Sequence, residues 1–175
     1  LKQDERVRNQ AVSTFFDRTT GYNIKLLSNS VQTIIGTYSN LTLLEETEVE
    51  LVPGSKFQFH HTVKNTGNTT ETYILSALFA PSNPFELEDI QIRVIDVNTK
   101  NELLKTDYNE LKTNEITQYP GQIFEVEILG RVSAKAILGN KAELTLELQT
   151  SNQEIYLTKT DKIEVVAGAN LRIVK

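Results

Sequence analysis

The sequence contains no cysteine, no methionine and no tryptophan. Without cysteine, disulfides, zinc–thiolate sites and thiol nucleophiles are all excluded. Methionine is missing even at position 1, so we expect the chain to begin after a cleavage or an artificial boundary, with any signal peptide already removed. No stretch approaches the roughly 18 consecutive apolar residues of a membrane span, so none is expected. The net charge of −5 comes without a Lys/Arg cluster, which argues against a nucleic-acid partner.

The dominant pattern in the sequence is the alternation of apolar and polar residues. Side chains that alternate in this way point to opposite faces of a strand, and one face of each strand is then buried. The predicted strands carry these alternating apolar sets: Phe57, Phe59, His61 and Val63; Tyr73, Leu75, Ala77 and Phe79; Ile90, Ile92 and Val94; Phe124, Val126 and Ile128; Leu144, Leu146 and Leu148; Ile163 and Val165.

Turn-forming residues separate these runs, notably at Pro53-Gly54, residues 65–68, Pro120-Gly121 and Gly139-Asn140. Short alternating strands separated by such turns are typical of two packed sheets. We therefore predict an all-β fold, an immunoglobulin-like or jelly-roll β-sandwich of two antiparallel sheets. A single helical turn is considered only for residues 101–112.

One short pattern occurs twice. Pro53-Gly54 precedes an alternating strand that begins at Phe57, and Pro120-Gly121 precedes one that begins at Phe124. We interpret the two segments as similarly placed strands in facing sheets.

The sequence offers little to support catalysis. His60 and His61 are the only histidines, and as neighbours on a strand they must face opposite ways, so they cannot converge on one metal or substrate atom. We expect one packed ring and one solvated ring. No Gly-x-Ser-x-Gly elbow or phosphate-binding glycine loop is present. We predict no enzyme activity, no catalytic residues, no metal and no cofactor.

Several polar segments could nevertheless serve as a calcium site or a crosslink. Glu46, Glu48 and Glu50 alternate and are expected on the solvent face of a strand. Residues 96–102 have oxygen ligands at alternating positions, as in a calcium loop, but lack the central glycine and distal glutamate of an EF-hand, so a polar hairpin is favoured. A lysine crosslink through Lys64 or Lys25 would need a buried carboxylate nearby, which the sequence cannot show.

A resemblance to a known family rests on residues 52–73. They contain Pro53-Gly54, an alternating strand, then Asn65-Thr66-Gly67-Asn68 and an aromatic residue, Tyr73. This order resembles the conserved-repeat domain of bacterial and archaeal surface proteins, a domain of unknown function. Residues 8–31 look like that family's closing hairpin, and Ala167 to Lys175 look like the opening strand of a following repeat. The resemblance implies a sandwich fold, a secreted and surface-exposed location, and a structural or adhesive role.

The order of these segments suggests how the chain is used. We divide it into an amino-terminal strand arm or hairpin, residues 1–36, and a β-sandwich domain, residues 37–175. A lone hairpin is unstable in water, and an incomplete sandwich exposes an unpaired edge. Donation of the arm to a neighbour resolves both problems. The expected interface residues are Val31, Thr33, Ile34 and Ile35 on the arm, and Leu171, Ile173 and Val174 near the other end.

Two functions follow from this organisation. In the first, the chain is an extracellular structural subunit that polymerises head to tail by strand donation into a pilus-like or biofilm-matrix filament. A general likeness to TasA and camelysin-type fibre subunits, without a shared motif, points the same way. In the second, it is one module of a longer cell-surface adhesin or surface-layer protein. Its partners are accordingly copies of itself or neighbouring domains of a surface protein.

Overall fold

A computed structural model describes residues 5–107 and 110–168. The chain divides into two compact units, residues 1–38 and 39–175, which are described separately. All regular structure in the described residues is β-strand, which confirms the all-β prediction.

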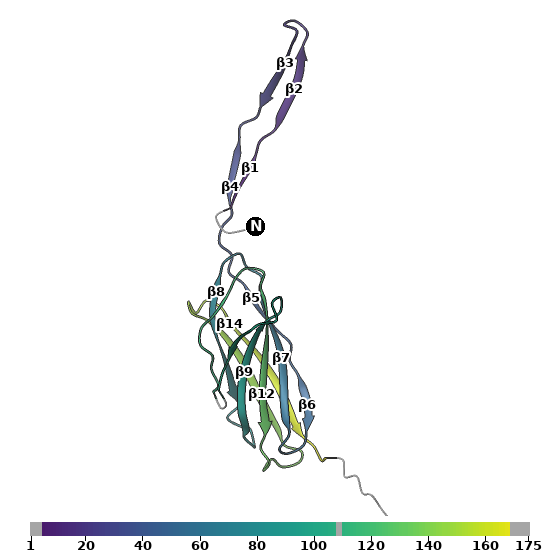
Figure 1. The fold of residues 1–175 in the computed structure, drawn as a ribbon, viewed down its shortest axis with the longest axis vertical. Helices are drawn as coiled ribbons and strands as arrows, with labels where there is room; N and C mark the ends of the chain where they lie inside the picture. Colours follow the sequence, from purple (N-terminus) through teal and green to yellow (C-terminus); the bar gives the residue numbers. More distant parts are fainter. Residues whose placement is uncertain (1–4, 108–109, 169–175) are drawn as a thin grey trace, which may run out of the picture. The chain divides into compact units, whose positions relative to one another are not determined.

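The first unit is a long two-stranded ribbon. Its strands are β1 (Arg6–Asn9), β2 (Val12–Asp17), β3 (Tyr22–Leu27) and β4 (Val31–Ile34). β2 pairs with β3 and β1 with β4, both antiparallel, so they form successive parts of one hairpin (Figure 1). At the tip, Gly21 adopts φ +73°, where a side chain would be strained, and its N–H bonds to the Asp17 carbonyl.

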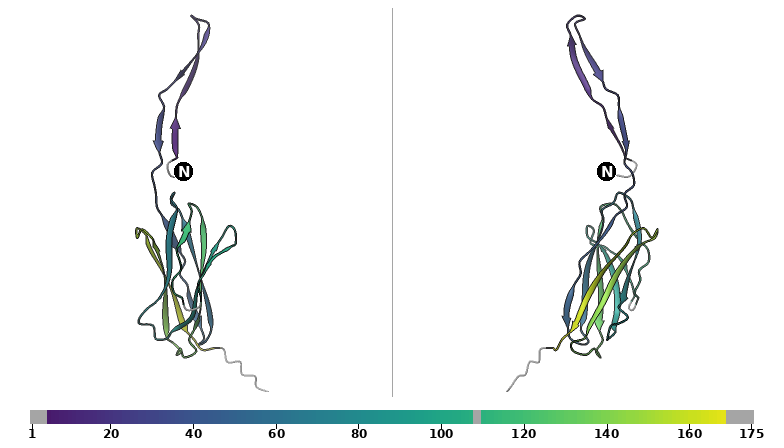
Figure 2. Two further views of the ribbon diagram at one scale, coloured as in Figure 1. Left: turned by 60° about the vertical axis from the view of Figure 1, so that its left-hand side comes forward. Right: turned by 180° about the vertical axis from the view of Figure 1, so that it is seen from behind.

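The second unit is a sandwich of two five-stranded sheets, whose layers can be followed in Figure 2. The first sheet has the order β10-β9-β12-β7-β5 and the second β11-β8-β13-β14-β6. The strands are β5 (Leu41–Leu44), β6 (Glu48–Leu51), β7 (Lys56–Asn65), β8 (Glu71–Phe79), β9 (Leu87–Asp96), β10 (Glu102–Lys105), β11 (Ile116–Gln118), β12 (Ile123–Val132), β13 (Lys141–Thr150) and β14 (Tyr156–Val165).

The chain changes sheets between β5 and β6. β5 pairs antiparallel with β7 in the first sheet, whereas β6 pairs with β14 in the second. The β6–β14 pair is parallel, the one exception among the described pairs to the predicted antiparallel arrangement. Each of these short strands covers only part of its long neighbour: β5 covers residues 62–65 of β7, and β6 covers residues 162–165 of β14.

The core forms as the alternation predicts. In β7 the odd-numbered residues from Phe57 to Asn65 are buried, and in β13 the even-numbered residues from Ala142 to Thr150 are buried. Glu48 and Glu50 are exposed on β6, as expected for a solvent face. Residues 102–105, considered for a helical turn, are instead β10, because this segment returns as a hairpin along β9.

The interpretation of the repeated Pro-Gly pattern was wrong. The strands that follow the two turns, β7 and β12, lie side by side and antiparallel in one sheet rather than in facing sheets. Each turn sits beyond the end of the other strand: the Gly54 N–H bonds to Val132 and the Gly121 N–H to Asn65. Both glycines have φ near +80°, which explains their recurrence.

Gly130 is needed for packing rather than for a turn. A Cβ placed there would lie 2.5 Å from Phe57 Cζ and 2.6 Å from Ile90 Cδ1, both core side chains. We expect Gly130→Ala to lower the free energy of unfolding by about 1–3 kcal/mol, because the core must shift to admit a methyl group. Urea unfolding measures this. Gly36→Ala is the control, since no atom lies within 4 Å of its added Cβ; equal stability of the two variants would contradict the packing role.

Candidate assembly interface

The hairpin exposes an unusual amount of apolar surface. Nine large apolar side chains on it are at least 44% exposed: Val7, Val12, Phe15, Phe16, Tyr22, Leu26, Leu27, Val31 and Ile34. Its strands have exposed residues at nearly every position, in contrast to the alternating burial in the sandwich. An isolated two-stranded hairpin is at best marginally stable in water, and exposed apolar patches of this kind mark interaction surfaces.

The register sorts the side chains of β2 and β3 into two faces. Phe15 pairs with Ile24 and Ser13 with Leu26, so these four residues share one face with Asp17 and Tyr22. Phe16 pairs with Asn23 and Thr14 with Lys25, and with Val12 and Leu27 they form the other face. Phe15 and Ile24 are directly opposed on the first face, and Val12 and Leu27 on the second, which also carries the lysine and the asparagine.

The predicted interface residues are distributed over both faces of β4. Val31 and Thr33 share one face, where Thr33 pairs with Val7, and Ile34 lies on the other, paired with Arg6. Ile35 is half-buried, and its N–H bonds to the Glu5 carbonyl. Leu171, Ile173 and Val174 lie outside the described residues. Sequence reasoning did not select Phe15, Ile24 and Leu26; their alternation in a segment between turn formers was the available signal.

His60 lies on the outer face of the first sheet, in a ladder of charged groups. Its Nδ1 is 3.0 Å from Glu125 Oε1 and 3.9 Å from Glu127 Oε1. Arg93 donates to the other oxygen of Glu127 at 2.7 Å and to Glu102 at 2.8 Å. His60, Glu125 and Glu127 offer atoms close enough together to hold a cation. The ion pair with Arg93 already compensates the charge of the buried Glu127, so its burial does not require a cation.

His61 faces the core, so the two histidines diverge as predicted. Its Nε2 lies 2.9 Å from Asp161 Oδ2, and both side chains are 0% exposed. The Nδ1 of His61 faces the Glu45 carbonyl at 3.3 Å, while Asp161 Oδ1 accepts the Thr47 N–H at 2.8 Å. Both ring nitrogens thus have a polar partner although the side chain is buried. This pair joins the two sheets where the chain crosses between them.

The Asn-Thr-Gly-Asn segment closes one end of the sandwich. The buried Asn65 amide donates to the Thr69 and Gln118 carbonyls, and its oxygen accepts the Gly67 N–H. Gln118, also buried, donates to the Val63 and Gln122 carbonyls and accepts the Tyr73 hydroxyl at 3.0 Å. The segment that carries the family resemblance is therefore structural, with its polar side chains satisfied.

Tyr73 is expected to make the stability of the sandwich depend on pH. Burial strongly raises the pKa of its hydroxyl. Above pH of about 10 the unfolded chain releases this proton while the folded chain keeps it, so stability falls as the pH rises further. We expect Tyr73→Phe to lose about 1 kcal/mol at pH 7 and to flatten the decline above pH 10 by up to about 1.4 kcal/mol per pH unit. Urea unfolding at several pH values measures both, and an unchanged alkaline slope would contradict the assignment.

The other polar groups also have structural roles. Residues 96–102 form the β9–β10 hairpin turn, where Asp96 Oδ1 accepts the N–H groups of Asn98 and Thr99, so the polar-hairpin prediction is confirmed. Lys64 and Lys25 are exposed, which does not suit a buried lysine crosslink.

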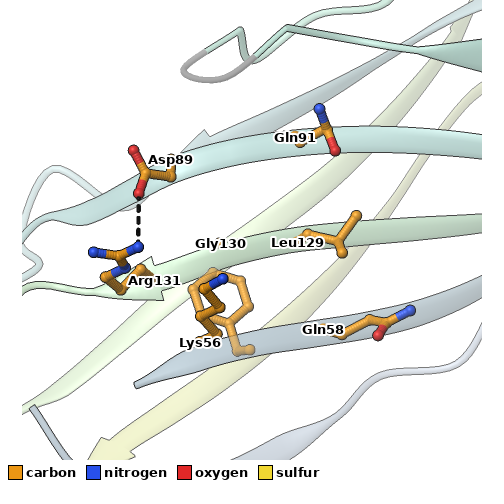
Figure 3. Close-up of a pocket in the computed structure, with 8 residues that line it drawn as sticks. Lys56, Gln58, Asp89, Gln91, Leu129, Gly130 and Arg131 are labelled. Carbon is orange, nitrogen blue, oxygen red and sulfur yellow. Dashed lines mark ion pairs between the residues drawn. The ribbon is translucent and has the colours of Figure 1, made fainter. Parts of the chain in front are cut away.

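A depression of about 620 Å³ lies on the outer face of the first sheet (Figure 3). Gln58 and Leu129 line it, the buried Gln91 donates to the Thr106 carbonyl, and Arg131 pairs with Asp89 at 3.5 Å. In the described part of the chain, no helix has the length and apolar character needed to cross a membrane.

Comparison with known proteins identifies the fold but no family. No protein-family model matches the sequence, and no curated protein matches it. Among solved structures, a family 123 glycoside hydrolase from Clostridium perfringens is similar at 10% identity and a TM-score of 0.53, over 75% of this chain. The chain spans only 28% of that enzyme, so this likeness concerns the sandwich fold.

Two other similar structures are a pilin subunit and two domains of an S-layer protein. The CooA pilin subunit from enterotoxigenic Escherichia coli matches at 11% identity over 73% of this chain and 99% of the pilin, with a TM-score of 0.38. Domains 4 and 5 of the S-layer protein SbsC match at 14% identity over 83% of this chain and 65% of that chain, with a TM-score of 0.34. The two packed five-stranded sheets define an immunoglobulin-like β-sandwich, and the apolar hairpin is a unit of its own.

Proposed function

We propose that this chain is an extracellular structural module, which joins β-sandwiches head to tail through its amino-terminal hairpin. The observation that carries the proposal is the contrast between the two units. The sandwich has its own continuous core, whereas the hairpin exposes nine large apolar side chains. The resemblance of residues 52–73 to the conserved-repeat domain of surface proteins supports a secreted, surface-exposed location.

The proposal requires that the hairpin contributes nothing to its own sandwich. We expect a variant comprising residues 39–175 to unfold in urea with the same free energy as the sandwich of the full chain, within about 0.5 kcal/mol. The variant retains every strand of both five-stranded sheets. If removing the hairpin lowered the free energy of unfolding by several kcal/mol, the proposal would be contradicted. The hairpin would then stabilise the sandwich of its own chain rather than connect it to another.

A second candidate is a filament made of copies of this chain. It is favoured by the two half-open edges, residues 56–61 of β7 and 156–161 of β14, which β5 and β6 leave uncovered. Exposed strand edges accept strands from other chains. Electron microscopy of the full chain beside the 39–175 variant tests this candidate. Fibres that require residues 1–38 support it, and a full chain that stays monomeric at high concentration rules it out.

A further inference from the structure

The hairpin has the same plan as the last two strands of the sandwich. β13 and β14 form an antiparallel hairpin whose strand register ends at Gln149 and Tyr156, and the next two residues continue it, with the Thr150 N–H bonded to the Ile155 carbonyl. In the first unit Asp17 and Tyr22 make the last pair. The loops, residues 151–154 and 18–21, therefore have equal length.

Aligning these two loops assigns a role to each face of the hairpin. With Asp17 on Thr150 and Tyr22 on Ile155, the Phe15–Ile24 pair falls on Leu148–Leu157, and the Ser13–Leu26 pair on Leu146–Lys159. Leu146 and Leu148 are 0% exposed, and Leu157 packs on the core. Phe16 falls on Gln149, which is exposed to solvent. Phe15 and Ile24 thus correspond to the inward face of the closing hairpin, and Leu26 falls on the half-exposed Lys159 at the margin of that face.

The segments that follow the two hairpins also agree. After β4 the sequence reaches Asn40-Leu41-Thr42-Leu43-Leu44, in which β5 opens the sandwich with Leu41 and Leu43 buried. After β14 it reaches Asn170-Leu171-Arg172-Ile173-Val174, which repeats the asparagine and the alternating apolar positions. The same short sequence pattern therefore follows each of the two hairpins.

We propose that the Phe15–Ile24–Leu26 face docks as the closing two strands of a second β-sandwich of this class, one whose own β13–β14 position is vacant. The inference rests on the proposed function and names its partner. A complete copy of residues 39–165 cannot accept the hairpin in this way, because β13 and β14 already fill the position between β8 and β6. The partner surface is the uncovered apolar inner face of such a sandwich.

A hybrid chain supplies this partner. Residues 39–140, the sandwich body without β13 and β14, are placed directly before the full chain, so that the hairpin follows the body as β13–β14 normally do. The residues before β1 lengthen the connection between body and hairpin, and a longer connection costs little free energy. Hydrogen exchange followed by mass spectrometry is measured on the hybrid and on the full chain alone. We expect exchange of the β2 and β3 amides to be slower in the hybrid by at least about 100-fold.

Phe15 and Phe16 provide a matched pair of variants, since they are adjacent, identical in type and on opposite faces. In the hybrid, Phe15→Ser should abolish most of the gained protection, while Phe16→Ser should retain it within about tenfold. The downstream sandwich is the internal reference in both. Equal exchange in hybrid and full chain, a body that stays unfolded, or loss of protection only in Phe16→Ser would each overturn the inference. The proposed function fails separately, if removing the hairpin destabilises the 39–175 sandwich.

Discussion

Replacing Asp161 by alanine is expected to lower the free energy of unfolding by about 3–5 kcal/mol, since it removes one partner of a buried polar pair and leaves the His61 ring without it. His61 and Asp161 are fully buried, 2.9 Å apart, and connect β7 of one sheet with β14 of the other. The substitution also removes the acceptor of the Thr47 N–H, at the point where the chain changes sheets. Urea unfolding followed by circular dichroism measures the loss.

The control for this prediction lies in the same region. Glu46 pairs with Lys159 at 3.6 Å on the surface, with their side chains 55% and 30% exposed. Surface pairs of this kind contribute little, so Glu46→Ala should change stability by at most about 1 kcal/mol. If Asp161→Ala were as mild as Glu46→Ala, the buried pair would not hold the sheets together.

Gln118→Ala is expected to destabilise the sandwich by roughly 3 kcal/mol. Gln118 is 0% exposed and bridges the carbonyls of Val63 and Gln122 to the Tyr73 hydroxyl. Truncation removes three hydrogen bonds and leaves the buried hydroxyl without its acceptor, and unsatisfied buried groups are more costly than the bonds themselves.

Gln149→Ala is the matched control for Gln118→Ala, because Gln149 is exposed on β13, and it should stay within about 0.5 kcal/mol of the parent chain. Unfolding in urea compares the two variants directly. Comparable stabilities would show that the polar network at this end of the sandwich is dispensable.

Much of the fold could be predicted because alternation reports directly on a sheet with one buried face. Phe57, Phe59 and Val63 lie in the core, as their spacing predicts. Sheet membership could not be read in the same way, since period-two alternation gives the face of a strand but not its neighbours. The two Pro-Gly strands were therefore assigned to facing sheets, although they are adjacent. The short edge strands β5, β10 and β11 have too few residues to show a pattern.

The candidate interface was predicted in outline and not in detail. The low stability of an isolated hairpin pointed to the arm, but the sequence suggested Val31 to Ile35 as its contact residues. Which side chains share a face depends on the pairing of Phe15 with Ile24, which only the register shows. The buried pair of His61 and Asp161 was likewise out of reach, because the two residues are brought together by sheet packing across the core.

The central claim is that the hairpin becomes stable only when it docks on another β-sandwich. Hydrogen exchange of the full chain at low concentration is the most direct test of this claim. The account predicts that amides of β2 and β3 exchange within about tenfold of an unfolded peptide, while amides of β13 and β14 are strongly protected. Strong protection of β2 and β3 in the dilute, monomeric chain, equal to that of the sandwich, would contradict the account, because the hairpin would then be stable without any partner.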